Sequence, residues 1–446
     1  MERRSGRREF LKQCALGLAA TTAGATGCAG AGAGSDEAPL PDDSGAAPPF
    51  PEAWRSASTD QERWRAVRDQ FLLEPGYAYF NTGGLGPSPR PVLSAVDEAW
   101  RRLELRSETS HGERAGVRAR VAALLGCAED ELAFTRNATE AMNLVARGLS
   151  LHDGDEVVMT THEHPGGAMP WFGLREDVGI RIRTVEPGRG GDDTLSRLVA
   201  ALTPRTRVVM VCHITCTTGL VFPVREIVDL CRERRMVSVI DGAQAMGQIP
   251  VDLGALGCDF YVASGHKWLL GPKETGVLYV RDEWLDRWKP SYVGGYSDAV
   301  FDLDAGEFRR LRPASASEYG TRNTPLLLGL GAAFGFLSTM GMEVVATRGA
   351  ELAGRLRDGL TPLKGVEILT PAGAAAAILT FRLPTTGRLP GTGGKAGDWC
   401  NLLRIDHGLR LRPVGEAGLN GIRASPHVFN SEDEVDRLVD VLARLL

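Results

Sequence analysis

The chain has 446 residues, of which 43% are hydrophobic and 24% are charged, a globular composition with room for two or three domains. Its formal net charge of −5 gives no reason to expect nucleic acid or an anionic membrane surface as a partner. The six cysteines after position 28 lack the spacing of a disulfide framework, a zinc knuckle or a redox motif, and we expect most of them to be buried as small apolar residues.

The first 28 residues are predicted to be an export signal. Arg7 and Arg8 stand before Phe-Leu in "RREFLK", and a weakly apolar Ala/Gly/Thr-rich stretch follows as far as Gly27. This stretch is too short and too polar for a permanent membrane span, but it suits a cleavable signal with a positively charged start. The arginine pair resembles a twin-arginine signal, which implies the twin-arginine export machinery as a partner and a periplasmic or cell-envelope location. A disordered basic tail is the alternative.

Cys28 resembles a lipidation site, although Ala25 stands where leucine is usual. A lipid anchor at Cys28 and ordinary cleavage nearby remain two alternatives. Residues 29–50 are small, acidic and rich in proline. Such a segment cannot bury enough apolar surface to fold, so we predict a flexible linker.

From Tyr77 onward, short β-rich runs alternate with helical patterns. Helices are predicted at 195–202 and 224–235, and strands at 157–161, 180–186, 208–214, 237–241, 260–264 and 276–280. This alternation predicts an α/β fold with a mostly parallel sheet covered by helices on both faces. Ligands bind such sheets beyond the carboxyl ends of the strands, so the polar residues that follow each run are candidate site residues.

The pattern changes near Leu326 to longer helices and few strands, and the chain closes with a predicted helix from Glu432 to Leu446. We therefore predict two domains. The larger one, at 51–325, includes an N-terminal arm and the candidate ligand site. The smaller one, at 326–446, is an α+β domain.

Lys267 stands between two predicted core strands in "YVASGHKWLLGPKETGVLYV". A lysine that reaches out of a loop into solvent is the ordinary interpretation. The alternative is an amine held partly desolvated, so that it can be neutral and nucleophilic. Asp241 closes an earlier predicted strand, where a carboxylate needs a cationic or hydrogen-bonding partner, although it could simply cap a helix. A lysine and an acid at the ends of neighbouring strands form the pair that pyridoxal phosphate requires.

A phosphate site is predicted where Asn137, Ala138 and Thr139 open a helix after a strand. The first turn of a helix offers unpaired N–H groups and a partial positive charge. Ser264 and His266 flank the lysine and would complete this site. Asn and Thr also cap ordinary helices, so the pattern alone is weak.

His164, in "THEHPGG", follows another predicted strand. It is a candidate for stacking on an aromatic cofactor ring. A metal pair formed with His162 is an alternative, but the sequence suggests no third ligand. An ordinary loop histidine is the default interpretation.

Five ordered motifs together resemble the class V aminotransferase family of pyridoxal phosphate enzymes: 135–140, 163–164, 241–244, 264–268 and 320–321. The similarity runs from about Tyr77 to the C-terminus. It is greatest to isopenicillin N epimerase-like members, and cysteine desulfurases are more distant. It implies a type I aminotransferase-like fold, pyridoxal 5′-phosphate as cofactor and a homodimer.

Carried over to this chain, the resemblance implies that Lys267 forms the Schiff base, that Asp241 partners the ring nitrogen and that His164 stacks on the ring. Further cofactor contacts are implied for Ala138, Thr139, Gln244, Ser264, His266 and Thr321. Gln244 is implied to face the phenolic oxygen of the cofactor, and Thr321 to reach the phosphate from the partner subunit.

On the substrate side, the resemblance implies roles for two residues. Asn81 lies in "FNTGG", which resembles the loop that lines the substrate side of the pocket. Arg423 lies in "IRASPHVFN" and would clamp a substrate carboxylate, for which the bidentate geometry of arginine suits better than lysine.

The chain also departs from the desulfurase pattern. The segment before Arg423, "HGLRLRPVGEAGLNGIR", has no cysteine that could transfer a persulfide. Cys216 stands where desulfurases have asparagine, and Glu274 occupies a position that is often glycine.

These observations predict a pyridoxal phosphate-dependent enzyme of the aminotransferase or epimerase type, which acts on an amino acid or small amine through an aldimine with Lys267. Transamination, racemisation and β-elimination share one carbanion, so the motifs do not separate them. The alternatives are a pyridoxal phosphate-dependent C–S lyase or desulfurase-like enzyme, a non-catalytic envelope binding protein that retains the fold, and a metal-dependent hydrolase built on His162, His164 and His213.

Overall fold

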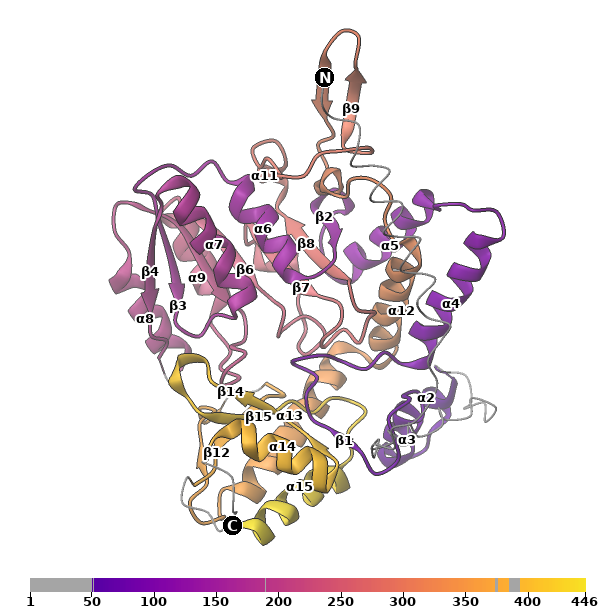
Figure 1. Cartoon of the computed structure of the whole chain (residues 1–446), viewed down its shortest axis with the longest axis vertical. Coiled ribbons are helices and arrows are strands. Elements are labelled where there is room, and N and C mark those ends of the chain that lie inside the picture. Colours follow the sequence, from indigo (N-terminus) through magenta and orange to yellow (C-terminus); the bar gives the residue numbers. More distant parts are fainter. Residues whose placement is uncertain (1–49, 51, 189, 374–375, 385–393) are drawn as a thin grey trace, which may run out of the picture. The chain divides into compact units, whose positions relative to one another are not determined.

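The computed structural model describes residues 50, 52–188, 190–373, 376–384 and 394–446 (Figure 1). The predicted export signal at 1–28 and the linker up to residue 49 lie outside the described residues. Within the described part of the chain, no single helix is both long enough and apolar enough to cross a membrane. The helices Thr324–Met340 and Met342–Leu360 are bent by 79° at their junction. Only as a pair, and only by length and composition, do they meet the requirements of a membrane span.

A seven-stranded sheet forms the centre of the larger part, in the order β2-β8-β7-β6-β5-β3-β4. Its strands are β2 (Leu132–Thr135), β3 (Glu156–Thr160), β4 (Arg181–Val185), β5 (Thr206–Cys212), β6 (Val237–Asp241), β7 (Phe260–Ser264) and β8 (Gly276–Val280). Neighbouring strands from β4 to β7 run parallel, whereas β8 is antiparallel to both β7 and β2. The predicted mostly parallel α/β sheet is confirmed.

Both faces of this sheet are buried because successive strand side chains point to opposite sides. In β5, Val209 and Val211 pack into one core cluster, whereas Val208 and Met210 pack into another. Helix α9 contributes to the first cluster, and α6 and α7 contribute to the second. Two apolar faces explain why these strands read as continuous apolar runs in the sequence.

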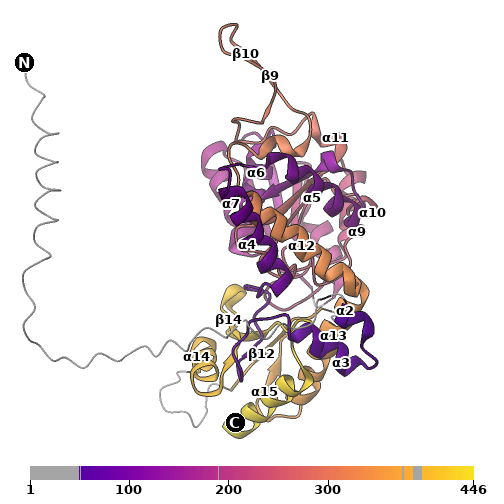
Figure 2. The ribbon, with the colours of Figure 1, turned by 90° about the vertical axis from the view of Figure 1, so that its right-hand side faces the viewer.

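The helices of the larger part are α2 (Glu52–Ser56), α3 (Asp60–Arg68), α4 (Arg90–Glu104), α5 (His111–Leu124), α6 (Ala138–Gly148), α7 (Pro165–Val178), α8 (Gly191–Ala201), α9 (Val224–Glu233), α10 (Leu253–Leu256) and α11 (Asp282–Leu285). The hairpin of β9 (Asp298–Asp302) and β10 (Glu307–Arg310) projects from the rest of the chain (Figures 1 and 2). Helix α4 runs beside α12 (Thr324–Met340) (Figure 2).

The C-terminal part has a four-stranded antiparallel sheet in the order β11-β12-β15-β14. Its elements are α13 (Met342–Leu360), β11 (Glu367–Ile368), β12 (Leu379–Arg382), α14 (Ala396–His407), β14 (Arg412–Val414), β15 (Gly421–Ala424) and α15 (Glu432–Leu445). This sheet has a core cluster of its own, to which β1 (Ala78–Tyr79) adds by parallel pairing with β13 (Leu409–Arg410). The predicted boundary at 325/326 falls inside α12, and the division into domains stays a prediction.

Candidate active site

The predicted site residues gather at the carboxyl edge of the central sheet. Asp241 is the last residue of β6 and Ser264 the last of β7, while Lys267 lies in the connection from β7 to β8. Ser264 and Thr135 both pair in register with Gly276, the first residue of β8, so the ends of three strands lie side by side. Because the carboxyl ends of parallel strands share one edge, positions far apart in the sequence meet there.

Lys267 and Asp241 are both buried, at 9% and 5% exposure. Burial lowers the pKa of Lys267, and the nearby carboxylate of Asp241 only partly opposes this effect. A lysine whose pKa is lowered releases its proton more readily and becomes a better nucleophile and base. The amine of Lys267 is therefore prepared for chemistry rather than turned out into solvent.

The carboxylate of Asp241 keeps one oxygen available. Its Oδ1 accepts a hydrogen bond from the backbone N–H of Ala243 at 2.9 Å. Its Oδ2 faces the first turn of α7, where a Cβ added at Gly167 would stand 2.7 Å from it. Glycine at this position keeps the space beside Oδ2 open, which fits a ring N–H that needs an anionic partner.

The N-terminus of α6 forms a cradle suited to a phosphate group. The Asn137 side chain caps the helix by accepting from the Glu140 N–H at 2.9 Å, and Ser264 Oγ lies 3.1 Å from the Ala138 nitrogen. Thr139 is exposed in the same first turn, and a Cβ at Gly166 would collide with its hydroxyl. N–H groups, hydroxyls and a positive helix end are the donor set that binds phosphate. Residues predicted from separate motifs are thus brought together.

His164 caps α7 with its side chain. Its Nδ1 accepts from the Gly166 N–H at 3.0 Å, which leaves Nε2 as the protonated nitrogen of the neutral ring. Burial, and then Lys267, lower the pKa of His164 to about 4. His266, half-buried beside the lysine, has its pKa lowered to about 4 by the same two causes. Both imidazoles are therefore neutral near pH 7, and a neutral ring suits stacking.

The side-chain amide of Gln244 makes two hydrogen bonds within the chain. Its Nε2 donates to the Gly83 carbonyl at 2.9 Å, and its Oε1 accepts from Trp268 Nε1 at 2.8 Å. The implied contact with the phenolic oxygen of the cofactor stays a prediction. The two bonds tie the "FNTGG" loop to the residue after Lys267, a connection that the sequence did not indicate.

Arg423 is a buried cation without a carboxylate partner among the described residues. Its side chain in β15 is 1% exposed, its Nη1 donates to the Cys216 carbonyl at 2.8 Å, and its Nη2 lies 3.4 Å from Asn81 Oδ1. Its Nε is buried without a hydrogen-bond partner. Burial and then Arg412 lower its pKa to about 10. A buried guanidinium in this state is stabilised by an anion, and a substrate carboxylate would supply one.

Arg412 and Glu416 also belong to this region, although the sequence patterns did not single them out. Arg412 in β14 is the cross-strand partner of Arg423 in β15, so the two arginines lie side by side on adjacent strands. Glu416 forms an ion pair with Arg412. Like charges directly opposite one another are destabilising. Glu416 offsets this by its ion pair with Arg412, and from a greater distance it also opposes the lowering of the Arg423 pKa. The pairing of β14 with β15 was the missing information.

Thr321 is the one predicted cofactor residue that the structure does not bring to the buried group. It is exposed, and it lines a surface cavity of about 230 Å³ together with Thr135, Arg136 and Glu274. Glu274 has a φ of 59°, which lies in the left-handed region that favours glycine. This backbone conformation explains why glycine suits that position.

The metal-dependent alternative finds no support in the described residues, which contain no group of three side chains able to hold a metal ion. His162 Nδ1 lies 2.7 Å from Thr217 Oγ1, and His213 Nδ1 lies 3.0 Å from the hydroxyl of Tyr261.

The cysteines among the described residues are all free, and five of the six are buried.

Lys267, Asp241 and the N-terminus of α6 lie along one edge of an α/β sheet. They offer an amine, a carboxylate and a cradle for a phosphate, which suits a pyridoxal phosphate-dependent enzyme. The family model described as aminotransferase class-V matches residues 95–438, and the chain belongs to this family. The predicted class, fold and cofactor are confirmed.

Several known proteins are similar to this chain. Isopenicillin N epimerase of Amycolatopsis lactamdurans is 34% identical over 403 residues, which cover 86% of this chain and 98% of that protein. A probable cysteine desulfurase of Methanothermobacter thermautotrophicus is 29% identical over 402 residues, with the same two coverages of 86% and 98%. The apo structure of a cysteine desulfurase from Thermococcus onnurineus NA1 has a TM-score of 0.76 at 27% identity, and the match covers 85% of this chain and 97% of that one. A mutant of C-DES with glycine covalently linked to its pyridoxal phosphate has a TM-score of 0.77 at 27% identity, covering 85% and 99%.

We expect Arg423→Lys to weaken substrate binding with a smaller effect on kcat. Lysine keeps the charge but loses the second of two parallel donors, and a hydrogen bond to a charged group contributes about 1.5–3 kcal/mol. KM should therefore rise roughly ten- to hundredfold. The matched control is Arg382→Lys on the neighbouring strand β12, where the arginine pairs with Glu367. Equal KM values for the two variants in steady-state kinetics would refute the clamp.

Proposed function

We propose that the chain catalyses an aminotransferase- or epimerase-type reaction at the α-carbon of an amino acid. The observation that carries this proposal is a fully buried Arg423, with no ion-pair partner among the described residues and an unbonded Nε, in the same region as the buried Lys267. Contacts connect the two residues: a Cβ at Gly83 would meet both Arg423 and Gln244, and Gln244 accepts a hydrogen bond from Trp268, the residue after Lys267. An α-carboxylate on Arg423 would place the α-carbon toward the lysine, whereas a small amine would leave the arginine without an anion.

The site residues have separate roles in the proposed reaction. The bound cofactor supplies a ring that accepts electrons from the substrate carbon. Lys267 would hold the cofactor and, because its pKa is lowered, would move the α-proton. Asp241 would keep the ring nitrogen protonated, His164 would stack on the ring, and the first turn of α6 would hold the phosphate.

A desulfurase-like reaction is the second candidate, because relatives and structural neighbours carry that name. The chain offers little for persulfide transfer. Cys216 is buried, and burial raises the pKa of its thiol, so it is a poor nucleophile. C–S lyase chemistry needs no such cysteine, and it remains an outcome of the experiment below.

The experiment is to incubate the purified holoenzyme with a panel of L- and D-amino acids and simple amines, each with and without a keto acid. We expect turnover of an amino acid, seen as a keto acid-dependent amino transfer or as interconversion of enantiomers. Release of sulfide or of a keto acid without an acceptor would instead assign elimination. Turnover confined to amines without a carboxylate would contradict the role of Arg423.

Twin-arginine export and a periplasmic or envelope location, with lipidation or cleavage near Cys28, are part of the same proposal. They are supported by the sequence of residues 1–28 alone. Cell fractionation of the full chain and of an Arg7→Lys/Arg8→Lys variant tests them. Export of the double variant at the rate of the unaltered chain would contradict the twin-arginine assignment.

We also propose a homodimer in which Thr321 completes the partner's phosphate site. Thr321 is exposed and lines a surface cavity with Thr135 and Arg136. A nearby cavity of about 590 Å³ is lined by exposed apolar side chains, among them Leu85, Leu93 and Trp100. Exposed apolar surface of this kind supports an interface, and a two-fold dimer is the commonest way to cover one.

Mixing two inactive chains tests the shared site. Chains with Lys267→Ala and chains with Thr321→Arg are purified separately, mixed under conditions of demonstrated subunit exchange, and assayed. Each mixed dimer has one site with both good residues, so activity should return to roughly a quarter of the unaltered level, since half of the dimers are mixed and each has one competent site. No recovery would mean that each chain builds its site alone.

A further inference from the structure

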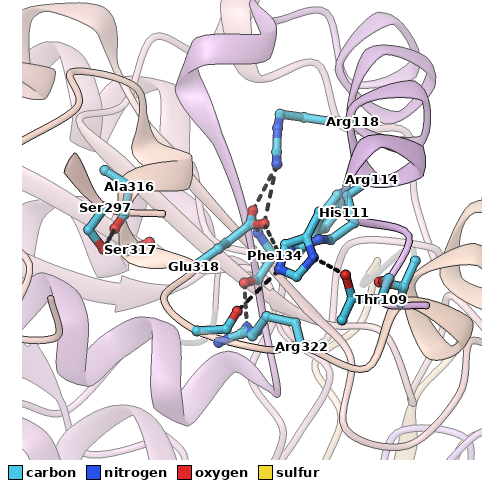
Figure 3. A network of polar contacts seen from close by, with 12 residues as sticks. Thr109, His111, Arg114, Arg118, Phe134, Ser297, Ala316, Ser317, Glu318 and Arg322 are labelled. Atoms are coloured by element: carbon cyan, nitrogen blue, oxygen red, sulfur yellow. Dashed lines mark hydrogen bonds and ion pairs between the residues drawn. The ribbon is translucent and has the colours of Figure 1, made fainter. Parts of the chain in front are cut away.

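Glu318 is buried at the centre of a network that joins helix α5, an edge strand and the segment that carries Thr321 (Figure 3). Its side chain is 4% exposed. Its Oε1 accepts from Arg118 Nη1 at 2.8 Å and from the backbone N–H of Phe134 at 2.7 Å. Its Oε2 accepts from Arg118 Nη2 at 3.2 Å and lies 3.7 Å from Arg114 Nη1.

Phe134 lies in β2, which forms one edge of the central sheet. An edge strand presents N–H and C=O groups that no neighbouring strand pairs. At Phe134 the N–H donates to Glu318, and the C=O accepts from Arg322 Nη2 at 2.9 Å. Two side chains of one segment therefore bind the edge of β2 in the place that another strand would take.

The position of this attachment connects two parts of the proposed site. Three residues after Phe134, Asn137 caps α6 and opens the phosphate cradle. Between Glu318 and Arg322 lies Thr321, the residue proposed to reach the partner's phosphate. The segment is held at both of its ends to the strand that leads into the cradle.

The charges make this attachment specific. Arg114 is 5% exposed, and burial lowers its pKa while Glu318 opposes that effect. Glu318 is the only carboxylate within ion-pair distance of Arg114 and Arg118 among the described residues. A shift of the segment would separate these buried charges, which is strongly unfavourable, so the backbone of residues 318–322 is kept in one placement.

We propose that Glu318 is a positioning residue that places Thr321 for the phosphate of the partner subunit's cofactor. This inference depends on the proposed homodimer. Glu318 touches neither substrate nor cofactor in it; it acts through the segment that it fixes. Its effect should therefore appear in the site of the opposite subunit rather than in the site of its own chain.

Dimers with a single competent site test this directly. Two chains with different affinity tags are combined so that only one of them retains Lys267. In the first dimer, Glu318→Gln is placed on the Lys267→Ala chain, so the altered segment serves the competent site. In the second dimer, Glu318→Gln is placed on the competent chain itself. Cofactor is titrated into the apo dimers and fixed with borohydride, and mass spectrometry measures the fraction of Lys267 chains that carry it.

In the first dimer we expect the competent site to bind cofactor roughly tenfold more weakly than in a dimer with unaltered Glu318, as for the loss of a hydrogen bond to a charged group. In the second dimer we expect a change of less than about twofold, because β2 keeps its pairing with β8. Equal weakening in both dimers, or weakening in the second alone, would overturn the proposal, since a structural role in the chain's own fold acts that way.

Glu318→Gln leaves two buried guanidinium groups without a carboxylate and could impair folding, so Arg322→Met provides a second variant. It removes the bond to the Phe134 carbonyl without leaving a buried charge, and it should weaken the first dimer only. Arg120→Met is the matched control. Arg120 is exposed on α5, the helix of Arg114 and Arg118, and its substitution should change cofactor binding in neither dimer.

If Lys267→Ala and Thr321→Arg chains do not complement each other, the shared site itself has failed and this proposal fails with it. If they complement but Glu318→Gln and Arg322→Met do not act across the dimer, only the positioning role is wrong.

Discussion

Lys267→Ala is expected to abolish turnover and the visible absorbance of the covalently held cofactor while the protein still folds. The change removes the nucleophile and the proton-transferring group together, so kcat should fall by at least roughly 10²- to 10⁴-fold, the range for the loss of a positioned general base. Folding should persist because the variant takes a buried cation out of an apolar environment. Absorbance spectra, steady-state rates and far-UV circular dichroism measure the three expectations.

The matched control is Lys273→Ala, six residues further on and exposed in the same connection between β7 and β8. It should keep both the spectrum and the rate. Borohydride should fix the cofactor to Lys267 in the unaltered chain and in this control. Near-normal turnover of Lys267→Ala would withdraw the assignment of the lysine.

Asp241→Asn should bind cofactor yet turn over substrate roughly 10²- to 10³-fold more slowly, the range for removing one preorganised electrostatic partner. The amide keeps the shape of the side chain and can retain the bond to the Ala243 N–H through its oxygen. It loses the negative charge that would hold a proton on the ring nitrogen. Spectra should show a bound cofactor in both forms of the enzyme, and only the rate should differ.

Glu163→Gln is the control for this change. Glu163 is a second buried carboxyl in the same region, and burial, with a further contribution from Asp241, raises its pKa to about 8. Near pH 7 it is therefore mostly protonated and neutral, and a neutral amide should replace it with little effect on the rate. An equal loss of rate in both variants would show that packing at the carboxyl edge, rather than the charge of Asp241, controls the reaction.

The central sheet was predictable because most of its strands are short, apolar and bounded by polar residues, although the edge strand β4 is largely polar and exposed. The predicted strand at 237–241 matches β6, and those at 260–264 and 276–280 match β7 and β8. The prediction at 208–214 begins two residues late, because β5 starts with the polar Thr206 and Arg207, which pair in a strand although their side chains do not read as apolar. Strand pairing is made by backbone hydrogen bonds, so a strand can extend beyond the apolar residues that predict it.

The site was predictable as far as motifs mark strand ends. Lys267, Asp241, Ser264 and His164 each follow or close a strand, and the parallel topology then brings them together. Arg412 and Glu416 were not predicted as site residues because no local sequence motif distinguishes them. Their relation to Arg423 exists only through the antiparallel register of β14 and β15, which the sequence does not state. Side-chain hydrogen bonds between segments far apart in the sequence, such as the two of Gln244, likewise cannot be read from local sequence.

Arg423 has no ion-pair partner in the part of the chain that the structure describes, and this has a consequence for the stability of the protein. A buried guanidinium with an unbonded Nε makes the free protein less stable than an apolar residue of similar size would, and the anion that occupies the site would return that free energy as binding affinity. With the proposed role of Arg423, part of the specificity for substrate would already be present before the substrate binds, as a local instability that a suitable anion relieves. Substitutions that stabilise the free protein at this position would be expected to do so at the expense of its activity.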